Sequence, residues 1–177
     1  MSCSHFNPYR CLLTLESGRV TRYHSAVTVQ PQTLAAHQWG CAMLAVYITG
    51  GDISARLLTE CLVHDTPELF TGDVPYTAKQ EHPSLKLKLD ELETHYRTTQ
   101  LLVGQQELTS KEWEVLKMAD TLEGLLWCSH AERGHVVFSR WKNAYHHGAA
   151  KWRTLLPSEW MNRADILVAT LPTNHHG

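Results

Sequence analysis

Two histidines and two aspartates have side chains suited to binding a metal ion. They are His37, His64, Asp65 and Asp120. His64 and Asp65 are adjacent at the end of a strongly apolar run, whereas the other two lie far from them in the chain. Neutral imidazoles and carboxylates together suit a divalent transition metal, so these residues could form one mixed nitrogen and oxygen site.

The spacing of neighbouring apolar residues places His37 and Asp120 on inward faces of helices. His37 lies three residues after Leu34 and four before Cys41, and therefore follows the apolar stripe of its segment. Asp120 lies four residues after Leu116, again on the apolar side. A buried unpaired carboxylate costs several kcal/mol, so we expect a cationic group to compensate Asp120.

Each of these residues also has a purely structural interpretation. A single inward histidine is commonly a hydrogen-bonded core residue, and a mid-helix aspartate is commonly the buried partner of Arg or Lys. The five cysteines are scattered without a C-x-x-C pair, which indicates reduced thiols rather than a disulfide framework or a zinc ribbon. Cys41 and Cys61 lie in apolar stretches and are expected to be small core residues.

Helical periodicity dominates the rest of the chain. Gly50 and Gly51 end the helix that carries His37, Ser54 caps the next, and Thr109 or Ser110 caps the helix that carries Asp120. Residues 71–75 form a turn, and residues 27–30 could be extended. The pattern predicts an all-α domain of roughly six to eight helices. The expected helices include residues 33–48, 54–70, 83–102, 110–130, 136–146 and 157–171.

Composition excludes several classes of protein. The 177 residues are 43% hydrophobic and carry a net charge of −2, which suits one globular domain over residues 1–177 and argues against a basic nucleic-acid binder. No apolar run approaches the roughly 18 residues of a membrane span. The first ten residues lack the apolar core of a signal peptide. We therefore expect a cytoplasmic protein that binds neither membrane nor nucleic acid.

One segment carries a specific resemblance. Residues 62–75 read LVHDTPELFTGDVP, with Glu68 three residues after the His-Asp pair and a T-G-D-x-P turn behind it. This string resembles the signature of the HD-domain phosphohydrolases, in the YfbR-like 5′-deoxynucleotidase branch. Three further segments agree in order: RYH at 22–24, QTLAAH at 32–37 and LKMAD at 116–120.

The resemblance implies an α-helical HD fold that acts on deoxynucleotides. It also implies that the two histidines and two aspartates bind one divalent ion, with Co, Mn, Zn and Mg all open as its identity. Glu68 is then expected to position or deprotonate the attacking water. Asp73 is expected to orient water or protonate the leaving oxygen, although an aspartate in such a turn also commonly bonds the local backbone.

The size of the chain and its Arg-Tyr-His segment are most similar to phage-encoded dATP triphosphohydrolases of the DatZ type. That subgroup implies that Arg22 contacts the phosphate or sugar, that Tyr23 stacks on the base, and that Ser25 lines the pocket. Tyr23 stands where an indole is common and Ser25 where a bulkier residue can occur. Lys79 and Lys117 are expected to contact the phosphates.

The expected activity is hydrolysis of dATP to deoxyadenosine and triphosphate, with dADP and dAMP as further substrates, depleting a deoxynucleotide pool. In a phage-encoded protein this would occur in the host cytoplasm. A 5′-deoxynucleotidase acting on monophosphates and a non-catalytic nucleotide-binding HD module remain alternatives.

We also expect a homo-oligomer. Trp39 points away from the His37 face and is expected to lie in the core or in a subunit interface. Trp141, Trp152 and Trp160 could form an interface or fill one core.

Overall fold

The computed structural model describes residues 7–26, 29–101, 106–129 and 135–171, and its fold is all-α, as expected. The helices are α1 (Pro8–Ser17), α2 (Leu34–Thr49), α3 (Ala55–Val63), α4 (Glu68–Thr71), α5 (Tyr76–Glu81), α6 (Pro83–Thr99), α7 (Ser110–Ser129), α8 (His135–Leu155) and α9 (Ser158–Ala169). The short strands β1 (Thr21–Arg22) and β2 (Gln32–Thr33) pair antiparallel.

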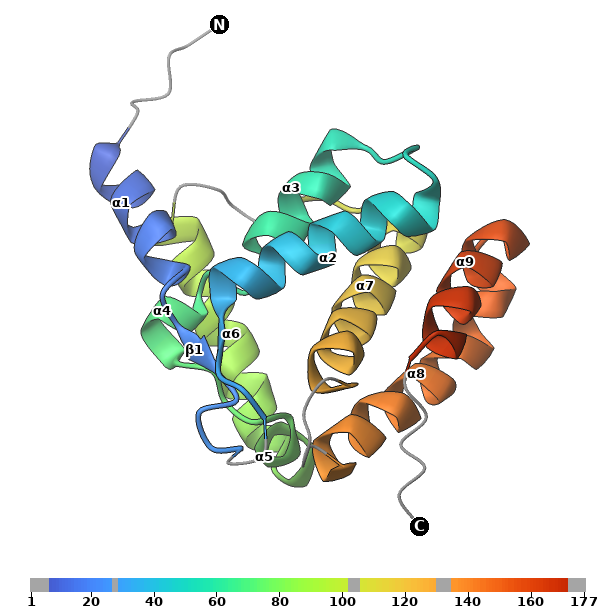
Figure 1. The fold of residues 1–177 in the computed structure, drawn as a ribbon. Helices are drawn as coiled ribbons and strands as arrows, with labels where there is room; N and C mark the ends of the chain where they lie inside the picture. The colour runs from blue at the N-terminus through green and yellow to red at the C-terminus, as the bar shows by residue number, and fades with distance from the viewer. Residues whose placement is uncertain (1–6, 27–28, 102–105, 130–134, 172–177) are drawn as a thin grey trace, which may run out of the picture.

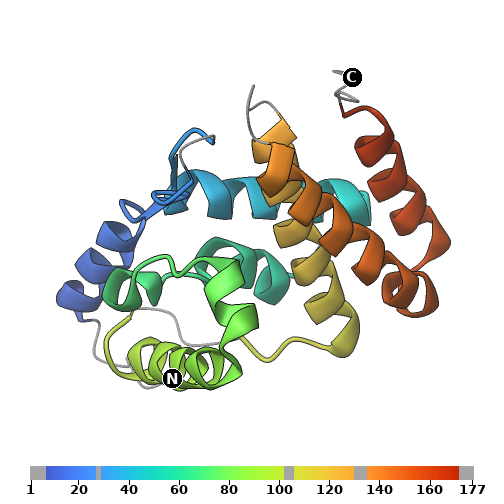
Figure 2. The same ribbon diagram turned by 90° about the horizontal axis from the view of Figure 1, so that it is seen from below.

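Helices α2 and α7 pack against each other at the centre of the molecule. In Figures 1 and 2, α1, α4, α5 and α6 lie on one side of this pair, and α8 and α9 lie on the other. The core between α2, α3, α7, α8 and α9 is apolar and includes Cys41, Cys61 and Leu122, each fully buried. Trp152 lies in this core and Trp141 and Trp160 pack against it, so the core interpretation of these three tryptophans is confirmed.

The predicted ends of the central helices are largely confirmed. Gly50 ends α2 with a left-handed φ of 70°. The hydroxyl of Ser54 accepts a hydrogen bond from Leu57 N at 3.2 Å and begins α3. At the start of α7, Thr109 Oγ1 accepts from Glu112 N at 3.3 Å, and the Glu112 carboxylate accepts from Thr109 N at 2.7 Å, a reciprocal capping box.

The expected single helix over 54–70 is wrong, because α3 ends at Val63 and a turn separates it from α4. Pro67 has no N–H to donate to the Val63 carbonyl, so the helix cannot continue through it. Thr66 bonds that carbonyl instead, with its backbone N at 3.1 Å and its hydroxyl at 2.7 Å. The turn holds His64 and Asp65 outside regular helix, at the edge of the core.

Other helix boundaries also differ from the expected ones, by a few to several residues. Helix α8 runs nine residues past the predicted end at 146, and α6 ends at Thr99. Helices α1 and α5 and the two strands were not predicted. Val27 and Thr28 of the expected extended piece, and the expected helix ends at 102 and 130, lie outside the described residues. No helix within the described ranges is long and apolar enough to cross a membrane.

Candidate metal centre

The fold brings together the four predicted metal ligands. His37 comes from α2, His64 and Asp65 from the end of α3, and Asp120 from α7. The Nε2 atom of His37 lies 3.4 Å from Asp120 Oδ1 and 3.5 Å from Asp65 Oδ2. Asp65 Oδ2 also lies 3.4 Å from His64 Nε2. Two ligand atoms about 2.0–2.1 Å from one tetrahedral ion would lie about 3.3 Å apart, so these separations fit a single divalent ion.

The hydrogen bonds of the two histidines leave one ring nitrogen of each facing the cluster. His64 Nδ1 lies 3.1 Å from the carbonyl of Cys61, an acceptor, and therefore carries the proton. His64 Nε2 is buried and has no hydrogen-bond partner among the described residues. His37 Nδ1 lies 2.5 Å from Glu123 Oε2, which leaves its Nε2 for the centre. Such orientation of the second nitrogen is typical of metal-binding histidines.

The electrostatics of the cluster favour a cation. Burial and Arg22 lower the pKa of His37, but hydrogen bonding to Asp120 and Asp65 outweighs them and raises it well above its usual value. Burial raises the pKa of Asp65 and Asp120, yet the two histidines reverse this and hold both values below the usual range. The charge distribution that favours a proton on His37 also favours a metal ion at the same place.

Glu123 is part of this centre and was missed by the sequence analysis. Its carboxylate is buried, and besides orienting His37 it accepts a hydrogen bond from Gln32 Nε2 at 2.6 Å. It lies three residues after Asp120 on the same helix, between the buried Leu122 and Leu125. The helical spacing that places Asp120 on the inward face of α7 also places Glu123 there, so the sequence did contain a signal for this residue.

A glycine on α2 makes room for this carboxylate. A Cβ at Gly40 would lie 2.7 Å from Glu123 Cγ and 3.1 Å from its Oε1. Any larger side chain at this position would push Glu123 away from α2. Gly40 therefore allows the two helices to approach closely enough for Glu123 to reach His37.

Arg22 is the cation expected to compensate the buried carboxylates. It lies on β1, is buried, and its Nη1 is 3.7 Å from Glu123 Oε2. Burial lowers its pKa, but Asp65, Asp120 and Glu68 together raise it above its usual value. Its Nε and Nη1 atoms have no hydrogen-bond partner among the described residues, which leaves them available to an anion.

The two predicted catalytic carboxylates lie beside the cluster. Glu68 begins α4 and is 5% exposed, and its Oε2 is buried without a hydrogen-bond partner in the described part of the chain. Burial, Asp65 and Asp73 raise the pKa of Glu68 to about 9, although Arg22 and Lys79 oppose the shift. Asp73 Oδ2 accepts a hydrogen bond from Tyr23 N at 3.2 Å. The turn that carries Asp73 is therefore hydrogen-bonded to the backbone directly after β1. Asp73 also acts electrostatically on Glu68, which lies at the cluster.

The other predicted substrate-binding residues come from the segment after β1, from α5 and from α7. Tyr23, in a left-handed conformation with φ 60°, has its ring 5.6 Å from the Arg22 guanidinium, and Lys79 on α5 acts electrostatically on Glu68. Ser25 is exposed just after Tyr23. The Lys117 ammonium lies 5.1 Å from the ring centre of Trp113 on its own helix. The structure therefore places Lys117 against Trp113, and no contact between Lys117 and the cluster is found among the described residues.

An all-α scaffold that joins a histidine, a His-Asp pair and a distant aspartate in this order defines a helical protein of the HD-domain class. Residues 11–155 match the model of the family described as 5′-deoxynucleotidase YfbR-like. The chain belongs to this family.

Individual relatives agree with this assignment. The chain is 28% identical over 174 residues to a dATP triphosphohydrolase of Salmonella phage PMBT28, covering 85% of this chain and 86% of that protein. Its fold matches that of the cyanophage S-2L HD phosphohydrolase DatZ, solved with dA and one catalytic Zn²⁺. That match has a TM-score of 0.68 at 20% identity and covers 90% of this chain and 95% of DatZ. The PH0347 protein of Pyrococcus horikoshii OT3 matches with a TM-score of 0.56 at 18% identity, over 92% and 97% of the two chains.

Proposed function

We propose that the protein is a metal-dependent deoxynucleotide phosphohydrolase that converts dATP and water to deoxyadenosine and triphosphate. One observation carries the proposal: a carboxylate oxygen of Asp65 and one of Asp120 each lie within 3.5 Å of His37 Nε2. The buried, unpartnered His64 Nε2 lies beside them. The phage relative that is named a dATP triphosphohydrolase supports this choice of substrate.

His37, His64, Asp65 and Asp120 would hold the ion. When bound, a divalent ion there would neutralise phosphate charge and make a nearby water more acidic. Zn²⁺, Co²⁺ and Mn²⁺ all suit imidazole and carboxylate ligands, and Mg²⁺ suits the carboxylates alone. The zinc found in the cyanophage structure favours Zn²⁺ among them.

The chain's own groups supply the acid and base chemistry. Glu68 Oε2, buried and without a partner among the described residues, accepts a hydrogen bond or a proton from the attacking water. Asp73, held by the Tyr23 backbone N–H, orients the water or passes a proton to the departing 5′ oxygen.

Cationic side chains bind the phosphates and the nucleoside lies near β1. Arg22 and Lys79 are both close enough to Glu68 for their positive charges to act on its carboxylate. Tyr23 and Ser25 follow Arg22 and are assigned to the base and its pocket. Lys117, whose ammonium lies 5.1 Å from the ring centre of Trp113, is assigned to the outer phosphates.

A 5′-deoxynucleotidase acting on monophosphates is the second candidate. The resting position of Lys117 favours it, because a monophosphate needs fewer cationic contacts than a triphosphate. The family description also names this activity. The two reactions use the same metal centre. They differ in the inorganic product, which is triphosphate in the first reaction and orthophosphate in the second.

The metal assignment is tested with Asp65→Asn, which keeps the size of the side chain and removes its charge. We expect hydrolysis to fall to background in the variant, and a chelator to abolish it in the unmodified protein. Asp90→Asn on α6, which removes a carboxylate from an exposed ion pair with Lys86, serves as the matched control and should retain full activity. Full activity in Asp65→Asn would contradict the ligand assignment.

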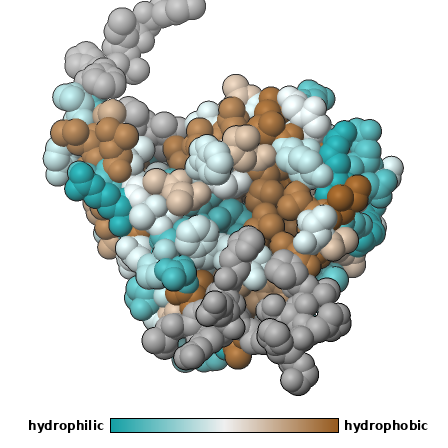
Figure 3. Space-filling view, viewed as in Figure 1, coloured by the Kyte–Doolittle hydropathy of each residue, from teal (hydrophilic) through white to brown (hydrophobic). Residues whose placement is uncertain are grey.

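We also propose that the protein forms a homo-oligomer through α2. Trp39 is 65% exposed, so of its two expected places, the core and a subunit interface, the core is wrong. Met43 and Tyr47, which are also exposed, continue the same stripe at four-residue spacing. Figure 3 shows hydrophobic residues gathered on the face where α2, α7 and α9 lie. Trp39→Glu should convert an oligomer to a monomer in light scattering, and a monomeric unmodified protein would contradict this assignment.

The protein is assigned to the cytoplasm, with a deoxynucleotide as its ligand and no nucleic-acid partner. Cys11, Cys41, Cys61 and Cys128 are all free thiols, as suits a reducing compartment. Cell fractionation with an antibody against the protein tests the location.

A further inference from the structure

A buried ion pair holds the last turn of α3, directly before the metal ligand His64. Glu60 lies one helical turn before His64, Arg97 lies in the last turn of α6, and 1% and 7% of their side chains are exposed. Arg97 Nη1 donates to Glu60 Oε1 at 2.6 Å and Nη2 donates to Oε2 at 2.8 Å, so the contact is bidentate. The backbone N–H of Gln106 also donates to Oε2, at 3.1 Å. The Glu60 carboxylate therefore joins α3 to α6 and to the segment before α7.

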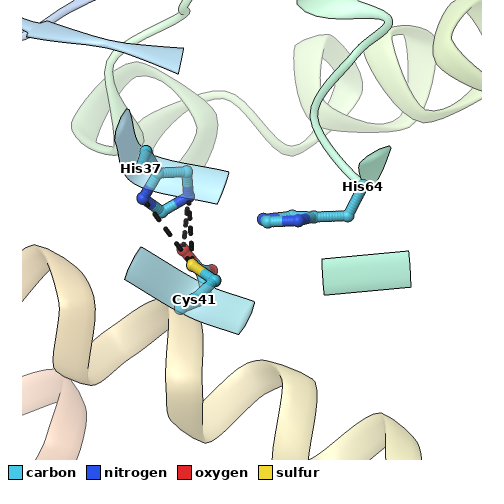
Figure 4. Close-up of side chains that lie close together, drawn as sticks. His37, Cys41 and His64 are labelled. Carbon is cyan, nitrogen blue, oxygen red and sulfur yellow. Dashed lines mark hydrogen bonds and ion pairs between the residues drawn. The ribbon is translucent and has the colours of Figure 1, made fainter. Parts of the chain in front are cut away.

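The same turn of α3 sets the position and the rotation of the His64 ring. The carbonyl of Glu60 accepts a hydrogen bond from His64 N at 2.9 Å. The carbonyl of Cys61 lies 3.1 Å from His64 Nδ1, and this contact leaves Nε2 for the metal. Figure 4 shows the ring extending from the end of α3 toward His37. A shift of Glu60 or Cys61 would therefore move the ring nitrogen that faces the metal centre.

Apolar packing alone would place the last turn of α3 less precisely. Leu57 and Cys61 of α3 belong to the apolar core, and such contacts tolerate small shifts and repacking. A guanidinium bound to both oxygens of a carboxylate fixes distance and orientation together. Because burying two charges removes their hydration, an ion pair of this kind commonly adds little net stability over apolar side chains of similar volume. What the pair of Glu60 and Arg97 contributes is therefore a defined geometry.

We propose that Glu60 and Arg97 are positioning residues of the metal centre, which fix the last turn of α3 and with it the direction of His64 Nε2. Neither side chain is assigned to the ion or to the substrate. Without the pair, α3 still packs on the core through Leu57 and Cys61, but the His64 ring is held less firmly and the ion is bound less tightly. The inference rests on the proposed metal centre and not on the identity of the nucleotide.

The double variant Glu60→Met/Arg97→Met separates a positioning role from a structural one. It removes both buried charges and keeps long, adaptable side chains, so we expect it to fold and to melt at a similar or higher temperature. Its affinity for Zn²⁺ should nevertheless fall about tenfold, as when groups that orient metal ligands are removed. Circular dichroism shows whether it folds, and isothermal titration with a competing chelator measures the affinity. Unchanged affinity in the folded double variant would overturn the proposal.

Arg97→Lys is the second variant and decides the matter if the double variant does not fold. It keeps the positive charge and loses the bidentate contact, so we expect Zn²⁺ affinity to fall about threefold or more. Tyr145→Phe is the matched control, because it removes a buried hydrogen bond of 2.8 Å to Asp165 Oδ1 between α8 and α9. This control should lower the melting temperature and leave Zn²⁺ affinity unchanged. Affinity in Arg97→Lys equal to that of the unmodified protein would contradict the positioning role.

The visible absorption of bound Co²⁺ gives a readout that depends on ligand geometry and not on the stability of the fold. We expect the spectrum to change in Glu60→Met/Arg97→Met and in Arg97→Lys, and to stay unchanged in Tyr145→Phe. If Co²⁺ gives the same spectrum and affinity in all of these proteins, the pair has no positioning role, although the metal centre stands. If the unmodified protein binds neither Zn²⁺ nor Co²⁺, the metal centre is wrong and the inference fails with it. Hydrolysis of nucleotides is measured separately, so a failed substrate assignment leaves these results unaffected.

Discussion

His37 Nδ1 lies 2.5 Å from Glu123 Oε2, and this hydrogen bond joins α2 to α7 directly behind the metal cluster. It fixes which ring nitrogen carries the proton, and therefore turns His37 Nε2 toward Asp65 and Asp120. The geometry of the centre thus depends on a residue that is not itself a ligand.

Replacing Glu123 should weaken metal binding without removing a ligand. In Glu123→Gln the charge that stabilises the protonated Nδ1 is lost, so we expect affinity for Zn²⁺ to fall by about 10- to 100-fold. Isothermal titration with a competing chelator measures it. Glu91→Gln, in an exposed ion pair on α6, is the control. Unchanged affinity in Glu123→Gln would show that the hydrogen bond does not position His37.

Adding a methyl group at Gly40 should disturb the same hydrogen bond. The new Cβ would lie 2.7 Å from Glu123 Cγ, so we expect Gly40→Ala to lower the free energy of unfolding by about 1–3 kcal/mol. The cost should shrink when Glu123 is already alanine, because the side chain that clashes is then absent. Urea unfolding of the four variants of this cycle measures the coupling, and additive effects would refute the contact.

The two lysines should differ in their effect on substrate binding. Lys79 acts on Glu68 at the cluster, whereas Lys117 lies against Trp113. We expect Lys79→Ala to raise the KM for dATP about tenfold through the loss of a charged contact, and Lys117→Ala to raise it less. Steady-state kinetics of both variants decide the matter. A larger effect at Lys117 would mean that this side chain moves to the phosphates when substrate binds.

Removing metal should destabilise the folded protein. An ion that binds only the folded state at 100 times its dissociation constant adds about 2.7 kcal/mol to the free energy of unfolding. We therefore expect the melting temperature to fall when a chelator is added, and to be insensitive to the chelator in His64→Ala. An equal response in both proteins would place the stabilising ion elsewhere.

Glu112 should make stability depend on pH in the acid range. Arg56, Ser54 and Thr109 outweigh the small cost of burial and lower the pKa of Glu112 to about 2 from 4.5. A lowered pKa in the folded state contributes stability that is present above the unfolded value and lost as the pH falls toward 2. We expect Glu112→Gln to cost about 2 kcal/mol at pH 7 and progressively less below pH 4.5. Urea unfolding across pH 3–7 measures this. A difference independent of pH would contradict it.

Much of the helical scaffold followed from the sequence because its signals are local. The glycine pair after α2, the Ser54 cap and the capping box before α7 each involve residues within a few positions of one another. The predicted continuation of α3 to residue 70 failed at Pro67, whose missing N–H was not weighed against the apolar run.

The site was predicted less completely. Periodicity turned His37 and Asp120 inward, but only the ordered family signature connected them with His64 and Asp65, since the ligands come from three helices. The role of Glu123 depends on how closely α2 and α7 approach at Gly40, which no local pattern states. The position of the Lys117 ammonium depends on its attraction to the Trp113 ring, a contact that the sequence analysis did not consider.

The most direct measurement is to incubate the metal-supplemented protein with each deoxynucleoside mono-, di- and triphosphate and to resolve both products. The account predicts deoxyadenosine and intact triphosphate from dATP, in amounts that depend on the metal and vanish in Asp65→Asn. Orthophosphate released only from monophosphates would instead identify a 5′-deoxynucleotidase. No turnover with any of the four metals would contradict the enzymatic account and leave a nucleotide-binding module.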